Sequence, residues 1–386
     1  MSSLKEILKR LQKLKELTTL GRLVTQTKET EYKGHIDSAN NFYYNKWTLL
    51  KLLFIQLYVP LYTSIISKYY KEFNYIDPFA GSGVNILKEE GKEGVIIAGS
   101  PIIALSFAPK PFTKAYLNDI VPSKITLLRK RIELLKCISQ NEVHRDYIFS
   151  KVSTEIDYDH IDANKHINRV YDEIEERSKE LLSKYKKGIH NLAFIDPFGL
   201  EFKRSSLERI LNSKVRTDII TLFNSYGAGM QAYNVIHLGY SSRSLDEHLG
   251  GEWYDYIRKR TQKEGLKLEN ISRNKLSEFL SDYYVGIFLK HNYVVRVIRL
   301  PLKLEAQQFD LIFACRRTKR GNPFLNGVEY IKEMLENTDY KLIDELLNYV
   351  ITGRMPGLIG YIIKNPEEAL EKYKTARRYG IKKDRG

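Results

Sequence analysis

Short apolar runs alternate with long helical stretches over most of this chain, and that alternation restricts the fold more than any other feature. Two of the stretches between the runs, Val121–Ile138 and Asp162–Lys187, have strong helical patterns. The five runs, each bounded by turn residues, are Glu72–Asp77, Thr113–Asn118, Tyr147–Val152, Asn191–Asp196 and Thr217–Asn224. Apolar strands that alternate with helices are typical of a parallel sheet covered on both faces. The pattern therefore predicts an α/β fold.

Two later runs, Tyr293–Leu300 and Phe309–Cys315, are separated by a polar stretch that is too short for a crossover helix. We therefore expect them to pair antiparallel. A mostly parallel seven-stranded sheet with an antiparallel strand pair at its end is the strand inventory of the Rossmann-like class I methyltransferase fold. The sequence predicts that fold, with helical extensions.

Three segments are expected along the chain. They are an N-terminal amphipathic helical extension at 1–39, a Rossmann-like domain at 40–335 with a helical insertion at about 235–290, and a C-terminal helical basic tail at 336–386. Met1–Leu17 carries leucine and isoleucine at helical spacing, and Ser3 and Glu6 are spaced as a capping box. An amphipathic helix of this kind suits a groove on a partner protein or a homo-oligomer contact.

Composition excludes several classes of protein. Hydrophobic residues make up 43% of the 386 residues, which is enough for a full core and excludes a disordered chain. The two cysteines, Cys137 and Cys315, exclude a disulfide framework and lack zinc-site spacing. The eight histidines show no metal-binding spacing either, so we expect no metal site. We predict a reducing, cytoplasmic location, and the Lys-, Ile-, Tyr- and Glu-rich usage indicates a thermophile.

The most apolar stretch, Trp47–Ser67, contains Lys51, Gln56 and Pro60. These residues favour a buried helix pair over a membrane span. The N-terminus does not have the pattern of a signal peptide. We therefore expect no membrane association.

The charge balance points to a polyanionic partner. Lys and Arg number 62 against 47 Asp and Glu, a net charge of +15. Glu371–Gly386 concentrates this excess, with basic residues throughout and only two acids. Such a segment can neutralise phosphates, although a solvated tail that keeps the protein soluble has the same composition. The wider excess favours nucleic acid, DNA or RNA, as the partner.

A glycine-containing loop follows the first predicted strand. After Asp77 the sequence continues through Phe79, Ala80, Gly81 and Gly83. In open α/β sheets, ligands bind beyond the carboxyl ends of the strands. Glycines without a Cβ let a ligand approach the backbone closely. We expect these five residues to line a cofactor site.

Two further acids follow later strands. Asp119 ends the second strand region and is placed to accept hydrogen bonds from both ribose hydroxyls of an adenosyl group. Asp162 follows the third, where it fits either the adenine amine or the N-cap of the next helix. The Gly-x-Gly-x-x-Gly signature of NAD-binding folds is missing, because no glycine lies three residues after Gly83. We therefore predict S-adenosylmethionine as the cofactor; ordinary strand-end acids are the alternative.

A second Asp-Pro-Phe, Asp196-Pro197-Phe198, ends the fourth predicted strand and is followed by Gly199. In methyltransferases that act on amines, this position carries Asp/Asn-Pro-Pro-aromatic. The carboxylate and a carbonyl hold the amine hydrogens, and the aromatic ring stacks on an extruded base. We predict that Asp196, Pro197 and Phe198 are catalytic. A strand-end turn with a buried Phe198 is the alternative.

Three further features have competing interpretations. Ser100 and Pro101 fit the N-cap and first position of a helix, with a contact on the cofactor side as the second interpretation. Lys46 opens a helix and faces either the cofactor carboxylate or solvent. Trp253–Arg260 has aromatic and basic residues that suit base stacking, but helical spacing favours one packed face.

These motifs together resemble the three-Cys-motif partner (TcmP) proteins over residues 40–335. The shared elements are Lys46-Trp47, Tyr75–Gly83, Gly99-Ser100-Pro101, Asp162-Ala163-Asn164 and Phe194–Gly199. A more distant resemblance is to the adenine-N6 methyltransferases of ribosomal RNA. The resemblance implies a methyltransferase-like fold with Lys46, Asp77, Gly81, Gly83 and Asp119 around S-adenosylmethionine, Asp162 near adenine, and Asp196 holding the target amine.

The sequence therefore predicts an S-adenosylmethionine-dependent methyltransferase acting on an exocyclic amine of a nucleic-acid base. The alternative is a catalytically inactive module of the same fold that binds nucleic acid or a partner protein, for instance in a defence system. Gly199 in place of the expected aromatic motivates this alternative. A metal-dependent nuclease is a weaker third hypothesis.

Overall fold

The computed structural model describes seven segments of the chain: residues 4–25, 46–87, 95–140, 148–299, 309–318, 322 and 324–336. These residues belong to two compact units. The larger unit is formed by the described residues of Leu50–Gly83 and Gly99–Glu336, and the smaller includes those of Met1–Leu49 and Val84–Ala98. Ser3 of the expected capping box and the basic tail Glu371–Gly386 lie outside the described residues.

The smaller unit contains helix α1 (Leu4–Leu23) and an antiparallel pair of short strands, β2 (Val84–Leu87) and β3 (Val95–Ala98). The helix extends six residues past the predicted end at Leu17. At Gly21, a Cβ atom would lie 2.7 Å from the backbone carbon of Ile97. Glycine therefore lets α1 approach β3 closely. The β2–β3 pair was not predicted.

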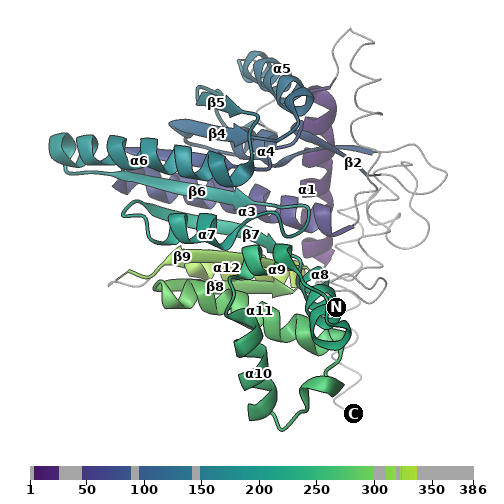
Figure 1. Ribbon diagram of the computed structural model, residues 1–386. Helices are drawn as coiled ribbons and strands as arrows, with labels where there is room; N and C mark the ends of the chain where they lie inside the picture. Colours follow the sequence, from purple (N-terminus) through teal and green to yellow (C-terminus); the bar gives the residue numbers. More distant parts are fainter. Residues whose placement is uncertain are drawn as a thin grey trace, which may run out of the picture. The chain divides into compact units, whose positions relative to one another are not determined.

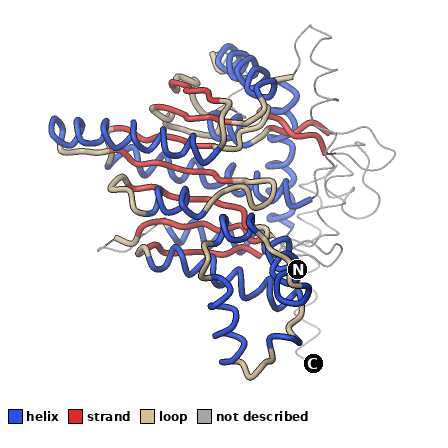
Figure 2. Tube along the Cα trace, viewed as in Figure 1, coloured by secondary structure: helices blue, strands red, loops and turns tan. Residues whose placement is uncertain are grey.

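The larger unit is built on one seven-stranded sheet, seen edge to edge in Figures 1 and 2. Its strand order is β5-β4-β1-β6-β7-β9-β8. The strands are β1 (Glu72–Asp77), β4 (Lys114–Asn118), β5 (Glu155–Asp159), β6 (Ile189–Ile195), β7 (Arg216–Phe223), β8 (Tyr293–Arg299) and β9 (Asp310–Arg316). The first five are parallel, and β9 runs antiparallel between β7 and β8. This order confirms the Rossmann-like class I methyltransferase fold.

One predicted strand was wrong. The third parallel strand is Glu155–Asp159, not Tyr147–Val152. It lies at the edge of the sheet, and its acids Glu155, Asp157 and Asp159 alternate with Ile156 and Tyr158. Charged residues on one face are a common feature of edge strands. Because of these acids, β5 lacks the continuous apolar run from which the other strands were predicted.

Helices cover both faces of this sheet. α6, α7 and α11 pack on one face, and α3 packs on the other (Figure 1). The helices are α3 (Lys46–Tyr69), α4 (Ser100–Ser106), α5 (Pro122–Ile138), α6 (Ala163–Tyr185), α7 (Arg204–Leu211), α8 (Ser225–Leu238), α9 (Arg243–Leu249), α10 (Trp253–Lys263), α11 (Arg273–Lys290) and α12 (Leu325–Glu336). A short 3-10 helix, η2 (Leu268–Asn270), precedes α11. Four helices, α8 to α11, thus connect β7 to β8.

Helix α3 runs through Pro60 without a break, so the predicted helix pair is a single helix. Thr48–Tyr69 is long and apolar enough to cross a membrane, but 72% of its most apolar part is buried. Tyr58 donates a hydrogen bond to Asp218 Oδ2 of β7 at 2.8 Å. Tyr62 Oη lies 3.0 Å from His190 Nδ1 of β6. These contacts with the sheet are those of a buried core helix, as predicted.

Candidate functional site

The candidate site lies at the carboxyl ends of the parallel strands, where the strand order changes direction. β1 has β4 and β5 on one side and β6 and β7 on the other. In open α/β sheets this switch point is where ligands bind. The loops that follow β1, β4 and β6 carry most of the predicted site residues.

Gly81 and Gly83 both adopt positive φ angles, +60° and +82°. A Cβ at Gly83 would lie 2.7 Å from Leu128 Cδ1, so this glycine faces packed protein. A Cβ at Gly81 would meet no atom of the described residues within 4 Å. The loop is therefore closed on the Gly83 side and open on the Gly81 side, where a ligand can approach the backbone.

Asp77 is buried at the end of β1 and holds this loop together. Its Oδ2 accepts hydrogen bonds from Tyr75 at 2.9 Å and Ser100 at 2.7 Å, and its Oδ1 accepts one from the Phe79 amide at 3.1 Å. Burial raises the pKa of Asp77 to about 7, while its three donors act in the opposite direction. Ser100 therefore supports Asp77. The prediction that it caps α4 was wrong, because Gly99 is the N-cap.

Asn118, which the sequence did not single out as a site residue, connects three loops. Its side chain donates to the carbonyls of Pro78 and Ile161 at 3.1 and 3.0 Å, and accepts from the Ile161 amide at 3.0 Å. Its carbonyl accepts from the Ala80 amide at 2.7 Å. The loops after β1, β4 and β5 are thus fixed to one another by one buried amide. The sequence feature that could have identified Asn118 is a polar residue at the end of an otherwise apolar strand.

Asp119 and Asp162 occupy different settings. Asp119 follows β4, accepts from the Val121 amide at 2.9 Å, and lies 3.5 Å from Lys124 Nζ. Its neighbour Ile120 is 66% exposed, which is unusual for a large apolar side chain. Asp162 accepts from the amides of residues 164 and 165 and is the N-cap of α6. The N-cap interpretation of Asp162 is confirmed.

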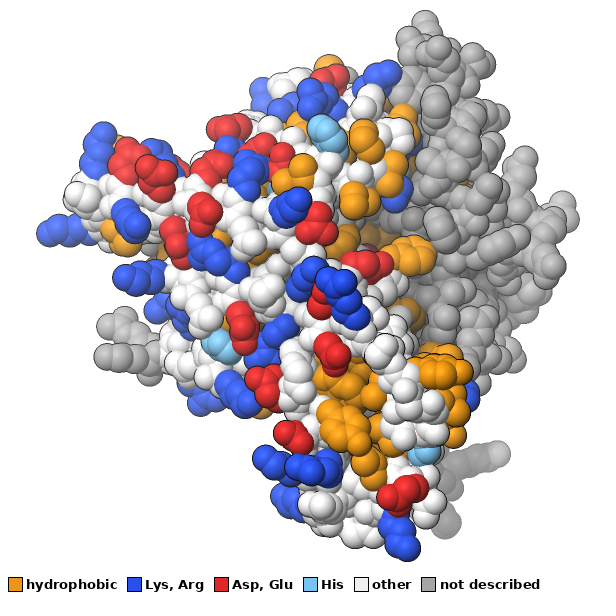
Figure 3. Space-filling view, viewed as in Figure 1, with side chains coloured by type: hydrophobic (Ala, Val, Ile, Leu, Met, Phe, Trp, Pro, Cys, Tyr) orange, Lys and Arg blue, Asp and Glu red, His pale blue; other side chains and the backbone are white. Residues whose placement is uncertain are grey.

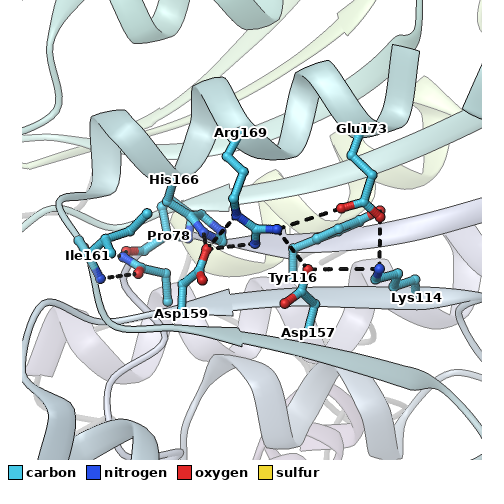
Figure 4. A network of polar contacts seen from close by, with 10 residues as sticks. Pro78, Lys114, Tyr116, Asp157, Asp159, Ile161, His166, Arg169 and Glu173 are labelled. Carbon is cyan, nitrogen blue, oxygen red and sulfur yellow. Dashed lines mark hydrogen bonds and ion pairs between the residues drawn. The ribbon is translucent and has the colours of Figure 1, made fainter. Parts of the chain in front are cut away.

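A charged network fixes the start of α6 against the edge of the sheet (Figure 4). Asp159 of β5 accepts from Arg169 Nε and lies within hydrogen-bond distance of His166 Nδ1, both at 2.8 Å. The bond to His166, followed by the charge of Arg169, holds the pKa of Asp159 below its usual value. Burial lowers the pKa of His166, which faces Asp159 from α6. Glu173 extends the network to Lys114 of β4 at 2.8 Å.

Asp196 follows β6 and forms an ion pair with Lys51 of α3. Both side chains retain a little solvent exposure. Pro197 is buried, whereas Phe198 is 69% exposed, so the interpretation of Phe198 as a buried turn residue was wrong. Lys51 is a site residue that the sequence analysis missed. A lysine within an otherwise apolar helix was the signal for it. Lys46 begins α3, and its side chain lies outside the described residues.

The loop after Asp196 is held at several points. The Gly199 amide donates to Glu201 Oε2 at 2.6 Å, and the Phe202 carbonyl lies 2.6 Å from His248 Nδ1 of α9. The ring of Phe202 packs edge-to-face on Phe79, 6.3 Å between centroids, so the two Asp-Pro-Phe loops are in contact. Within the described ranges, no group of three or more His, Cys, Asp or Glu side chains is arranged to hold a metal ion.

No protein-family model and no curated protein matches the chain. Among solved structures, protein LPL1258 from Legionella pneumophila strain Philadelphia 1, of family DUF519, aligns at 11% identity with a TM-score of 0.39, covering 73% of this chain and 91% of that one. The plantazolicin methyltransferase BpumL, crystallised with a desmethylPZN analogue and SAH, aligns at 10% identity with a TM-score of 0.29, covering 82% and 100%. These similarities are too low to carry an argument, so the fold assignment rests on strand order and direction.

Proposed function

We propose that this protein is an S-adenosylmethionine-dependent methyltransferase that acts on an exocyclic amine of a nucleic-acid base. One observation carries the proposal: the open Gly81 side of the loop lies at the switch point of a class I methyltransferase sheet. This point lies between β4, which Asp119 follows, and β6, which Asp196 follows. Bound S-adenosylmethionine would supply an electrophilic methyl group at the carboxyl ends of these strands.

The residues beside the loop fit an adenosyl group. The backbone at Gly81 leaves room for close approach, and the Asp119 carboxylate, fixed by the Val121 amide, would accept the ribose hydroxyls. The exposed Ile120 side chain offers an apolar surface for adenine. Asp162 already accepts two backbone hydrogen bonds through Oδ1, which leaves Oδ2 for the adenine amine. Asp77 supports the loop from inside.

The target amine would be held at Asp196. Its carboxylate accepts the amine hydrogens and directs the nitrogen lone pair toward the methyl group. Lys51 fixes the position of the carboxylate and balances its charge. The exposed ring of Phe198 provides a surface on which an extruded base can stack.

The same ion pair favours a second candidate function. Lys51 already occupies Oδ2 of Asp196, and Gly199 stands where methyltransferases acting on amines carry an aromatic residue. A module that keeps the fold and binds nucleic acid or a partner protein, without methyl transfer, would tolerate both features.

Calorimetric titration with S-adenosylhomocysteine, together with transfer of a radiolabelled methyl group to RNA and DNA, tests the proposal. The wild-type protein should bind at micromolar affinity and label one of the two nucleic acids. Asp196→Ala should abolish transfer while leaving the cofactor affinity within about twofold, because the proposal assigns Asp196 to the target amine and not to the cofactor. Binding without transfer by the wild-type protein would favour the module. Absence of binding by a folded sample would overturn the cofactor assignment.

Lys51 provides a further test of the same site. Lys51→Met keeps the length of the side chain and leaves Asp196 without its cation. We expect loss of transfer and a loss of stability of about 1–3 kcal/mol, measured by urea unfolding. Transfer at the wild-type rate would show that the ion pair has no role in holding the amine.

A further inference from the structure

Helix α8 presents an aromatic stripe that the proposed reaction does not use. Tyr226, Met230, Tyr233 and His237 recur at intervals of four, three and four residues, so they share one side of the helix. All four are half-buried. Tyr240 follows two residues beyond the helix and is 62% exposed. The tyrosines at 226, 233 and 240 are thus spaced by seven residues.

A second side of α8, about 120° around the helix axis from the stripe, is packed inward. Ser225, Ala228, Gly229 and Ala232 are buried. A Cβ at Gly229 would lie 2.9 Å from the backbone nitrogen of Ser277 on α11, so the two helices are in close contact there. Small residues bury that side. The aromatic residues flank it, where Tyr233 packs against the core and Tyr226 keeps part of its surface exposed. Figure 3 shows hydrophobic side chains gathered over the helices between β7 and β8.

The stripe begins beside the candidate site. β6 and β7 are paired in register, with Ile195 opposite Thr221. Asp196 follows Ile195 directly, and Asn224, three residues after Thr221, is the N-cap of α8. Tyr226 therefore lies in the first turn of a helix that starts at the carboxyl ends of the parallel strands, where Asp196 also lies. At 1.5 Å per residue, the seven residues from Tyr226 to Tyr233 span about 10 Å.

The charge around the stripe suits a polyanion. α8 contains no acidic residue, and the Arg273 guanidinium lies 4.8 Å above the ring of Tyr233. Tyr233 also stacks on His237 with 4.1 Å between ring centroids. Of the acids that follow α8 in the sequence, Asp246 and Glu247 bond to Trp253 and to Arg243 and Lys203, whereas Glu269 is exposed on η2, which contacts α8. Aromatic rings beside arginine bind single-stranded nucleic acid by base stacking, with little dependence on sequence.

We propose that the α8 stripe, Tyr226, Tyr233 and Tyr240, is a stacking surface for the unpaired bases of a nucleic-acid strand next to the target base. This inference rests on the proposed function for the identity of the target. It adds a binding surface outside the cofactor loop, and it favours single-stranded nucleic acid over a duplex, because paired bases are already stacked.

Fluorescence anisotropy with labelled 20-nucleotide single strands of RNA and DNA tests the surface in the full-length protein. The variant Tyr226→Leu/Tyr240→Leu keeps apolar side chains and removes two rings. Each lost stacking contact is worth about 1–3 kcal/mol, so the affinity should fall at least tenfold. The slope of log affinity against log salt concentration should stay unchanged, because no phosphate contact is removed. Binding of a matched duplex should change less than twofold.

The matched control is Tyr69→Leu/Tyr185→Leu, which changes two exposed tyrosines at the ends of α3 and α6, at the opposite edge of the sheet. This variant should bind the single strand like the wild-type protein. Equal loss in both variants, no loss in the α8 variant, or no binding by the wild-type protein would overturn the inference. So would an α8 variant that binds nucleic acid normally but changes its oligomeric state, because the face would then contact protein.

S-adenosylhomocysteine binding, measured on the same samples, separates this inference from the proposed function. The α8 variant should keep the cofactor affinity of the wild-type protein, because its changes lie outside the glycine loop. Loss of single-strand binding in a protein that binds no cofactor would support the stacking surface and reject the methyltransferase.

Discussion

At the scale of single residues, the two loop glycines have different physical constraints although both adopt positive φ. Left-handed backbone costs a residue with a side chain about 1–2 kcal/mol. Gly83 has a steric constraint in addition, because a Cβ there would lie against the side chain of Leu128 and 3.2 Å from Ile102 Cγ1. At Gly81, no atom in the described part of the chain lies within 4 Å of the Cβ position. The sequence contained both glycines but could not distinguish their surroundings.

We predict different effects for alanine at these positions. Gly83→Ala should lower the free energy of unfolding by about 2–4 kcal/mol, the sum of backbone strain and overpacking. Gly81→Ala should cost about 1–2 kcal/mol and reduce S-adenosylhomocysteine affinity at least tenfold, because the new methyl group enters the open side. Urea unfolding and calorimetry measure the two quantities. An unchanged affinity in Gly81→Ala would place the cofactor elsewhere.

The residues missed by sequence analysis have distant partners. Lys51 meets Asp196 across 145 positions of the chain, and Asn118 meets Pro78 and Ile161 across 40 and 43. No local pattern reports such pairs. The acids at strand ends were predicted because the end of a strand can be recognised from neighbouring residues. An apolar run that is followed by Asp places that Asp at the carboxyl end of the strand.

At the scale of secondary-structure elements, the buried strands were predicted within one or two residues because both faces are apolar. The edge strand β5 failed because one face is charged, and the four-residue strands β2 and β3 are too short to have a period. The contact between α3 and β7 also depends on a feature that the sequence did not reveal, the buried carboxyl group of Asp218.

Asp218 makes the α3–β7 contact sensitive to pH. Burial raises its pKa from 3.8 to about 7, while the Tyr58 hydrogen bond and the charge of Arg216 act in the opposite direction. An acid whose pKa is raised in the folded state stabilises the fold fully below about pH 4, and this stability is lost as the pH rises through 7. His190, 3.9 Å away, is neutral over this range because burial and the charge of Arg216 lower its pKa to about 3.

We therefore expect the Asp218→Asn variant to gain stability relative to the wild-type protein as the pH rises from 5 to 8. The relative gain should be on the order of 3 kcal/mol, because the variant has no carboxyl group to ionise. Comparing the two proteins removes the contributions of Asp77, His190 and His248, which titrate in both. Urea unfolding at pH 5, 6.5 and 8 measures the difference. A constant difference would show that Asp218 does not titrate in this range.

At the scale of the whole molecule, the chain contains two compact units, and the glycine loop belongs to the larger one. A ligand that binds only the folded state stabilises it by RT ln(1 + [L]/Kd), about 2.7 kcal/mol at a concentration of 100 Kd. If the cofactor site is built by β1, β4 and β6, this stabilisation should appear in the larger unit. The two tryptophans, Trp47 and Trp253, fall in different units, which allows the units to be observed separately.

The variant Trp47→Phe retains Trp253, which is buried in the larger unit and donates to Asp246 at 2.6 Å. We predict that saturating S-adenosylhomocysteine raises the melting temperature followed by Trp253 fluorescence by several degrees, since 1 kcal/mol corresponds to about 2–4 °C in a unit of this size. Adding Gly81→Ala should reduce that shift because it weakens binding at the loop. A shift of equal size in the Gly81→Ala background would mean that the ligand stabilises the larger unit from a site away from the switch point of its sheet.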